Sequence, residues 1–426
     1  MKIKETKGIT LIALVITIVV LLILAGVVIA TLNGNDNIIK NANTAVGKYN
    51  EKVNEEQGIL DTLEEKLKEY TNGGSSNPTT PEEPETPPTT PTVDSNGFAT
   101  KNETIKPSTN NANDLQIVIP EGFAPAILQT GTTQSLPGQD GSVKNKMPVS
   151  QWNNITAEDI NKGIVVVDAE GNEFVWIPIT DASKFARTAW TTKYGYDANG
   201  SFQSGTLTTP HPFADKSTEN RWWEDTSTTE YTNMVTSVTQ NKGFYVARYK
   251  ASANSNDSSK AQSKRGATTW TEISQTDAID KSKNYNSALH SHLMYGIEWD
   301  SILKWLEGNA TISSSTSVET KTMELADLQT DSGSWGNYLD STGNAATNSG
   351  SPQTTGKSEY WKANNIYDLA GNVVEWTQEK YSTGTMRAVR GGIYNDNGDT
   401  YPAASRMYAD ASDTFDNIGF RSSFYL

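Results

Sequence analysis

The sequence predicts an α+β head domain carried behind an N-terminal transmembrane helix, a heptad-patterned helix and a Pro/Thr-rich linker. Three observations in this chain of 426 residues lead to that prediction. Residues 9–30 form an uncharged apolar run, residues 71–97 are rich in Pro, Thr and Glu, and from Phe98 onward short apolar runs alternate with turn residues. Because hydrophobic residues make up only 35% of the sequence, part of the chain is expected to pack no core.

The run Ile9–Ala30 is long enough for a membrane span, since it would extend about 33 Å as an α-helix. It lacks the A-x-A-like site that ends a signal peptide. Lys2, Lys4 and Lys7 precede it, and positive charge marks the cytoplasmic side of a span. We therefore expect a single-pass protein of the cell membrane whose C-terminal head is extracellular.

The junction KGITLIALVI resembles the leader of type IV prepilins, which here would be residues 1–8. The resemblance implies a prepilin peptidase that cuts after Gly8, so that the mature chain begins at Ile9. The fifth mature residue of pilins is usually Glu, whereas this chain has Ala13. Processing is therefore expected, and entry into a pilus stays an open alternative.

Residues 31–70 carry apolar residues at alternating steps of four and three, which is the pattern of a coiled-coil seam. Two interpretations remain: a stalk that associates with copies of itself, or a pilin-like helix that packs on its own head. The spacer 71–97 has no apolar periodicity and favours the stalk, because it separates the helix from the head.

The head, residues 98–426, shows strand and helix signals. Val165–Val167 and Phe174–Ile177 are expected to form a hairpin, and Gly243–Lys250 a further strand. In MYGIEWDSILKWLEGN, apolar residues at helical spacing predict a helix that ends at Gly308.

Composition and motifs exclude several functions. A formal net charge of −15 argues against nucleic-acid binding, which needs a basic surface. The sequence has no cysteine, so it offers no disulfide, thiolate nucleophile or zinc–thiolate site. No nucleophile–base motif or phosphate-binding loop occurs.

Six blocks in the head carry a resemblance to a known family. They are FVWIPI, GFYVARYK, MYGIEWDSILKW, NIYDLAGNVVEWT, RAVRGGIY and NIGFRSSF, in this order. The set resembles the formylglycine-generating-enzyme (sulfatase-modifying factor) domain, a variant of the C-type lectin fold, over about Gly163 to Leu426. The head is therefore expected to be C-type-lectin-like.

Each block has an expected structural role. The apolar residues are expected in the core, namely Leu369, Val373, Val374 and Trp376. The glycines are expected at tight bends, namely Gly371, Gly391 and Gly392. Three arginines are expected to pair with carboxylates or carbonyls inside the fold, namely Arg390, Arg406 and Arg421.

The resemblance also implies a structural calcium ion. In the family it is bound by side chains at the positions of Asp368 and Glu375 and by backbone carbonyls at those of Gly371 and Val373. Oxygen ligands with two carboxylates suit a hard cation. A plain hydrogen-bonded turn is the alternative.

The family's activity depends on a pair of cysteines near its R-G-G and N-x-G-F-R blocks. Here the interval between those blocks, residues 390–421, has no thiol. We therefore expect no copper and no enzymatic activity, so an oxidoreductase of the formylglycine type is the least favoured function.

The same interval resembles the variable region of C-type-lectin-like proteins that retroelements diversify. There, randomised adenines scatter codons into Asn, Asp, Ser, Thr, Tyr and similar residues, and such residues also dominate antibody binding sites. An ordinary polar surface is the alternative. The candidate ligand contacts are Tyr394, Asn395, Asp396, Asn397, Asp399, Tyr401, Tyr408, Asp410, Ser412, Asp413, Thr414 and Phe415.

Two functions follow. The first is a membrane-anchored surface receptor or adhesin whose head binds a protein or glycan on another cell, a phage or a host surface. The second is a minor pilin or pseudopilin that carries the same head on a filament. Ala13 and the long spacer favour the first.

Overall fold

The computed structural model describes residues 90–107, 115–129, 142–196, 202–204, 222–254, 256–283, 289–315 and 319–426. The chain divides into two units, Met1–Glu85 and Thr86–Leu426, and all of the described residues belong to the second. The expected leader, transmembrane helix and heptad helix therefore lie outside the described residues. Within the described part, no helix combines the length and the apolar character needed to cross a bilayer.

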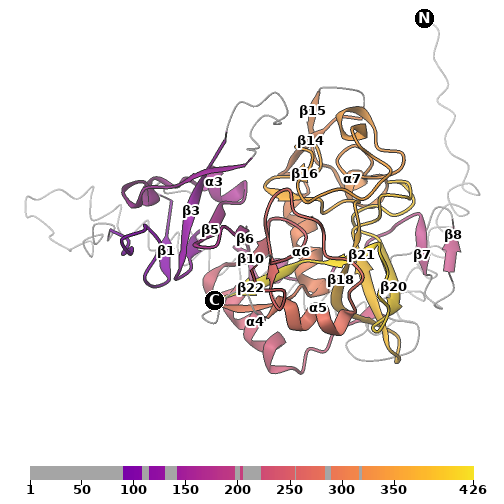
Figure 1. The fold of residues 1–426 in the computed structure, drawn as a ribbon, viewed down its shortest axis with the longest axis horizontal. Helices are drawn as coiled ribbons and strands as arrows, with labels where there is room; N and C mark the ends of the chain where they lie inside the picture. The colour runs from indigo at the N-terminus through magenta and orange to yellow at the C-terminus, as the bar shows by residue number, and fades with distance from the viewer. Residues whose placement is uncertain are drawn as a thin grey trace, which may run out of the picture. The chain divides into compact units, whose positions relative to one another are not determined.

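A seven-stranded antiparallel sheet organises the head (Figure 1). Its order is β13 (His290–Leu293), β22 (Ser422–Tyr425), β10 (Gly243–Ala247), β6 (Glu173–Pro178), β5 (Val165–Asp168), β3 (Phe123–Leu128) and β4 (Val143–Lys146). β5 and β6 form the predicted hairpin, in which Val165 pairs with Val175. The strand predicted from Gly243 is confirmed as β10, although it ends at Ala247 rather than at Lys250.

Both faces of this sheet are covered, which explains why every residue of β6 and β10 is buried. Glu173, the one charged residue of β6, pairs with Arg248. On β10, Phe244 and Val246 enter one core cluster, to which α4 (Thr229–Asn241) and α6 (Gly296–Leu306) contribute. Tyr245 and Ala247 enter a second cluster on the opposite face. The helix predicted from its apolar spacing is α6, and Gly308 follows its end in the left-handed region, with φ +73°.

A second sheet carries the C-terminal blocks. Its order is β20 (Arg406–Asp410), β19 (Met386–Arg390), β18 (Val374–Tyr381) and β21 (Ile418–Phe420), and β9 (Trp222–Trp223) pairs with the end of β18. β21 runs parallel to β18, whereas β19 and β20 form an antiparallel hairpin. The chain must therefore cross back between β20 and β21, and residues 411–417 make this crossover. Trp376 and Val389 of this sheet lie in the second core cluster, as expected for Trp376.

The remaining described elements are short. The strand pairs are β1 (Glu103–Ile105) with β2 (Ile117–Ile119), β7 (Tyr194–Tyr196) with β8 (Phe202–Ser204), β11 (Ser252–Ala253) with β12 (Ala261–Gln262), β14 (Thr311–Ser313) with β15 (Thr320–Thr322), and β16 (Lys362–Ala363) with β17 (Ile366–Tyr367). The helices are α3 (Ala157–Asn161), α5 (Gln275–Ser282) and α7 (Leu325–Gln329), with 3₁₀ turns η1 (Val149–Asn154), η2 (Ala182–Lys184) and η3 (Gly343–Ala346).

The end of the expected spacer packs on the head. Val93 forms a β-bridge with Ala99 and contacts the second core cluster. The Thr92 hydroxyl donates to the Glu103 carboxylate at 2.6 Å. The folded head thus reaches back beyond Phe98 into residues assigned to the spacer.

Candidate functional site

The blocks that frame residues 390–421 are anchored from inside by buried arginines. Arg390, Arg406 and Arg421 are each at most 1% exposed, and all three pair with carboxylates. The expectation that they pair inside the fold is therefore confirmed. A buried ion needs both a counter-charge and hydrogen bonds, so their partners determine how firmly the interval is held.

Arg390 and Arg406 belong to a buried charge cluster of three arginines and three carboxylates. Its members are Arg187, Glu224, Asp300, Glu379, Arg390 and Arg406. Asp300 on α6 accepts from Arg390 at 3.1 Å and from Arg406 at 2.5 Å, and Glu379 on β18 contacts both arginines as well as Arg187. The cluster therefore ties β18, β19 and β20 to α6.

Burial shifts the titration of this cluster. It lowers the pKa of Arg390 to about 10, and the neighbouring Arg406 adds to that shift. Burial raises the pKa of Glu224 to about 7, although Arg187 opposes the change. Glu224 also accepts the backbone N–H of Ile297 at 3.3 Å, near the first turn of α6. The formal charges of the six groups balance while Glu224 is ionised, and the cluster gains a positive charge as Glu224 is protonated near pH 7.

Arg421 belongs to a separate group that bears on the expected calcium site. Both carboxylate oxygens of Glu375 accept from Arg421, at 2.9–3.3 Å, and Oε1 also accepts from Lys250 at 2.5 Å. Burial alone would raise the pKa of Glu375, but Arg421 and Lys250 hold it below its usual range. A divalent cation at Glu375 would face these two buried cations.

The other residues that were expected to bind calcium are Asp368, Gly371 and Val373. Asp368 accepts the Gly356 N–H through Oδ2, its Oδ1 is buried without a hydrogen-bond partner, and burial raises its pKa to about 6. Gly371 donates its N–H to the carbonyl of Gly391, and Val373 is buried. We propose that Asp368, Gly371, Val373 and Glu375 form the hydrogen-bonded alternative rather than a calcium site, because cations of the chain already contact both oxygens of Glu375. Among the described residues, no group of three His, Cys, Asp or Glu could hold a metal ion.

We predict that a chelator leaves the stability of the chain unchanged. Addition of EDTA to the purified protein should not shift its melting temperature, because Lys250 and Arg421 supply the positive charge that Glu375 requires. Thermal unfolding followed by circular dichroism, with and without EDTA, measures this. A fall in melting temperature that added Ca²⁺ reverses would show that the ion binds and stabilises the fold.

Two glycines shape the backbone at the site, as expected. Gly392 has φ +76°, and a Cβ there would lie 2.1 Å from the carbonyl oxygen of Tyr401. Gly371 has φ +69°, and its Cβ would lie 2.2 Å from the carbonyl oxygen of Asn337. Larger residues would meet both backbone strain and a clash. These close approaches bring the segments at 337 and 401 against the framing blocks.

None of the candidate ligand contacts is buried. Five are exposed, namely Asn395, Asn397, Ser412, Thr414 and Phe415. The others are half-buried, namely Tyr394, Asp396, Asp399, Tyr401, Tyr408, Asp410 and Asp413.

Most of the candidate contacts lie in two segments, whereas Tyr408 and Asp410 lie on β20 itself. Residues 391–405, called the first loop, follow β19, whereas residues 411–417, called the crossover segment, follow β20. Because Arg390 pairs with Arg406 and Met386 pairs with Asp410, the two segments leave opposite ends of the β19–β20 hairpin. The structure therefore does not gather the interval into one continuous loop.

Several candidate residues also have roles within the chain. Tyr394 packs against the second core cluster, and Asp410 accepts a hydrogen bond from the Thr385 hydroxyl. The Tyr408 ring stacks on Tyr381 at a centroid distance of 4.7 Å and lies 6.5 Å from Trp222, so it supports the β9 edge of the sheet. Asp399 forms an ion pair with Lys193 at 2.6 Å. Substitution of Tyr408 would therefore disturb packing as well as any ligand contact.

Residues 331–342, called the rim segment, border the first loop and were not predicted to belong to the site. The N–H of Leu339 donates to the carbonyl of Asp396 at 3.0 Å, and Asp340 accepts the N–H of Gly398 at 2.7 Å. Tyr338 donates its hydroxyl to the carbonyl of Gly391 at 3.0 Å. Its sequence, DSGSWGNYLDST, carries no motif that could have assigned it to the site.

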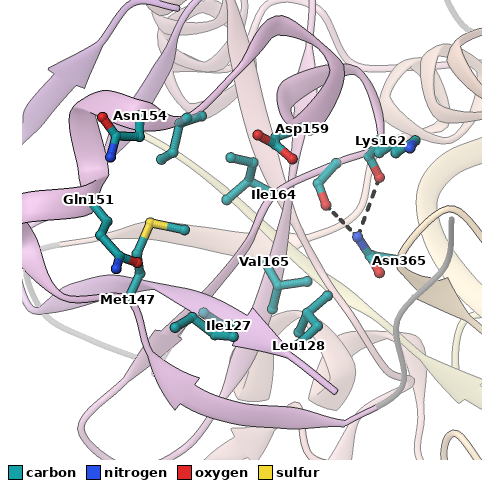
Figure 2. A pocket seen from close by; sticks show the side chains of 13 residues that line it. Ile127, Leu128, Met147, Gln151, Asn154, Asp159, Lys162, Ile164, Val165 and Asn365 are labelled. Atoms are coloured by element: carbon teal, nitrogen blue, oxygen red, sulfur yellow. Dashed lines mark hydrogen bonds between the residues drawn. The ribbon is translucent and has the colours of Figure 1, made fainter. Parts of the chain in front are cut away.

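A cavity of about 350 Å³ lies away from this interval (Figure 2). Ile127, Leu128, Ile164 and Val165 form apolar walls, and Asn365 closes one side by donating to the carbonyls of Lys162 and Gly163. Most of its lining comes from β3, η1, α3 and β5, and it contains no candidate contact residue.

Comparison with known proteins gives one family and several distant structures. The model described as the sulfatase-modifying factor enzyme 1-like domain matches residues 199–423. No curated protein sequence matches the chain. The structure of PvdO from Pseudomonas aeruginosa is similar over 61% of this chain and 96% of its own, with 13% identity and a TM-score of 0.35.

Two further solved structures are similar at the same low level. CarF matches over 43% of this chain and 87% of its own, with 14% identity and a TM-score of 0.29. Treponema denticola variable protein 1 matches over 76% of this chain and 99% of its own, with 14% identity and a TM-score of 0.22. Such scores are too low to carry a functional conclusion.

Proposed function

The chain belongs to the sulfatase-modifying factor enzyme 1-like family, whose model spans more than half of it, and from this premise we propose that it is a ligand-binding protein rather than an enzyme. The sequence lacks the cysteines on which the family's thiol chemistry depends. The C-type-lectin-like head then serves as a scaffold, and residues 390–421 supply the contacts.

One observation carries this proposal. The framing arginines of the interval are buried and ion-paired, whereas every candidate contact between them is exposed or half-buried. Substitutions at exposed positions that make no packing contact usually change stability by less than about 0.5 kcal/mol each. The first loop and the crossover segment can therefore vary in sequence while the charge cluster and the core keep the fold.

We further propose that the head is displayed on the cell surface by residues 9–30, after a prepilin peptidase removes residues 1–8. Its ligand is a macromolecule on another cell, a phage or a host surface. Variation of the interval by a retroelement belongs to the same proposal. The adjacent genomic sequence tests it, because a reverse-transcriptase gene and a near-repeat differing at adenines are expected there.

Substitution of two tyrosines tests the binding face. The full chain should select ligands from a random phage-displayed peptide library or a glycan array, and the double variant Tyr394→Ala, Tyr401→Ala should weaken that binding by more than about tenfold. Aromatic residues at the centre of an interface carry much of its affinity. Tyr408 is left intact because of its packing against Tyr381.

Tyr360→Ala is the matched control, since Tyr360 is also half-buried but lies outside the interval. It should leave binding within about twofold. Because Tyr394 also packs against the second core cluster, the double variant should lose some stability, so binding is compared at a temperature at which all variants are folded. Equal loss of binding in the control, or unchanged binding in the double variant, would place the ligand elsewhere.

A further inference from the structure

The strongest apolar feature of the described surface lies on the rim segment. Leu339 is 59% exposed, more than Phe415 at 50% or Leu325 at 40%, which are the other exposed large apolar residues of the described chain. Single exposed leucines are common on protein surfaces. Leu339 differs because its own backbone N–H is bonded to Asp396, one of the candidate ligand contacts.

The turn that presents Leu339 is held on both sides. The preceding Tyr338 is buried, and its hydroxyl donates to Gly391 at the start of the first loop. Ser341 accepts the N–H of Tyr338 at 2.7 Å and donates to the carbonyl of Gly336 at 2.7 Å. A side chain on such a turn keeps its position before a partner arrives, so less conformational entropy is lost on binding.

The first loop and the rim segment are joined along their length. Ser332 donates its N–H to Gly398 at 3.2 Å and accepts the N–H of Ala403 through its hydroxyl at 3.0 Å. Together with the Leu339–Asp396 and Asp340–Gly398 bonds, these contacts make the two segments one continuous surface. A ligand that contacts the first loop at Asp396 therefore meets Leu339 as well.

Carboxylates lie near this leucine along the rim segment, where Asp340 follows it directly in the chain. Asp331 and Asp340 are exposed, and a Cβ on Gly333 would lie 3.1 Å from Oδ1 of the first and 3.8 Å from Oδ1 of the second. Asp396 adds a third carboxylate, whereas Asp399 already pairs with Lys193. The surface thus combines an aliphatic centre with negative charge, an arrangement that interfaces with basic protein partners use.

We infer that the rim segment is a second wall of the binding face, with Leu339 as an apolar anchor, and that the partner is a protein surface whose apolar recess is bordered by Lys or Arg. This inference rests on the proposed function. The carboxylates repel nucleic acid. Tyr394 and Tyr401 of the first loop present rings that could stack on a sugar, but an aliphatic anchor beside carboxylates suits a basic protein surface better. The observations therefore favour a protein over the other classes of macromolecule.

The experiment uses the full chain with random phage-displayed peptides and a glycan array as the probes. Peptides that bind should contain Lys or Arg beside an apolar residue. The affinity of the best synthetic peptide, measured by biolayer interferometry, should fall by more than about tenfold in Leu339→Ala. Asp340→Asn, which keeps the acceptor for Gly398, should weaken the dependence of binding on salt concentration.

Leu325→Ala is the control, because Leu325 is an exposed leucine outside the rim segment. It should bind the peptide within about twofold of the unaltered chain. If Tyr394→Ala, Tyr401→Ala abolishes peptide binding while Leu339→Ala does not, the second wall is wrong and the proposed function stands. Selection of glycans instead of peptides overturns the inferred partner class. Binding to neither probe overturns the proposed function together with the inference that rests on it.

Discussion

Replacement of Asp300 by asparagine is expected to lower the free energy of unfolding by about 3–5 kcal/mol, which is the usual cost of breaking a buried ion pair on one side. The change leaves three buried arginines facing two carboxylates. Both oxygens of Asp300 accept hydrogen bonds: Oδ1 from Trp190 and Arg390, and Oδ2 from Thr188 and Arg406. The amide NH₂ of asparagine would replace one of these acceptors with a donor. Urea denaturation followed by tryptophan fluorescence measures the effect.

Glu158→Gln provides the matched control for Asp300→Asn. It removes the carboxylate that pairs with Lys162. The Glu158 side chain is 75% exposed and the Lys162 side chain 42%. Exposed ion pairs contribute little, so the midpoint of denaturation should hardly move. If both variants lose the same small amount, the buried charge cluster does not hold the β18–β19–β20 strands to α6.

Replacement of Trp376 by alanine is expected to cost about 3–5 kcal/mol, because a large buried aromatic ring leaves a cavity that the core fills only in part. Trp376 is completely buried in the second core cluster, and its Nε1 donates to the carbonyl of Ile273 at 2.9 Å. The midpoint of thermal unfolding, followed by near-ultraviolet circular dichroism, should therefore fall clearly below that of the unaltered chain.

Trp376→Phe separates the two contributions of this side chain. It keeps most of the ring volume and removes the N–H, so it should lose less stability than Trp376→Ala. A loss equal to that of alanine would show that the hydrogen bond to Ile273 outweighs packing.

Periodicity was sufficient to predict elements whose surroundings are local. The β5–β6 hairpin and helix α6 follow from spacing and turn residues within one stretch of sequence. The burial of Arg390, Arg406 and Arg421 was predicted as well, since arginines inside apolar blocks need internal partners. The identity of those partners could not be read from the sequence, because Asp300 and Glu379 reach them only through the packing of α6 on the second sheet.

The candidate site was predicted only in part for the same reason. Composition identified polar residues that the structure leaves exposed or half-buried, but it could not show that Tyr408 stacks on Tyr381. Lys250 lies far from Glu375 in the chain, so nothing in the DLAGNVVEW block indicated that a lysine would occupy the carboxylate expected to bind calcium. The rim segment has no motif, and only its hydrogen bonds to the first loop reveal it.

The position of β22 has a consequence for how the chain is made. This strand lies between β10 and β13, and its Ser423 contacts His292, a residue 131 positions earlier. At ordinary rates of translation that interval takes on the order of ten seconds. During this time the nascent chain carries β10 and β13 without the strand that joins them, each with an open edge able to pair with another chain. Yield in a cellular host should therefore depend on chaperones that shield strand edges, and a stop codon before Ser422 should send the product to aggregates.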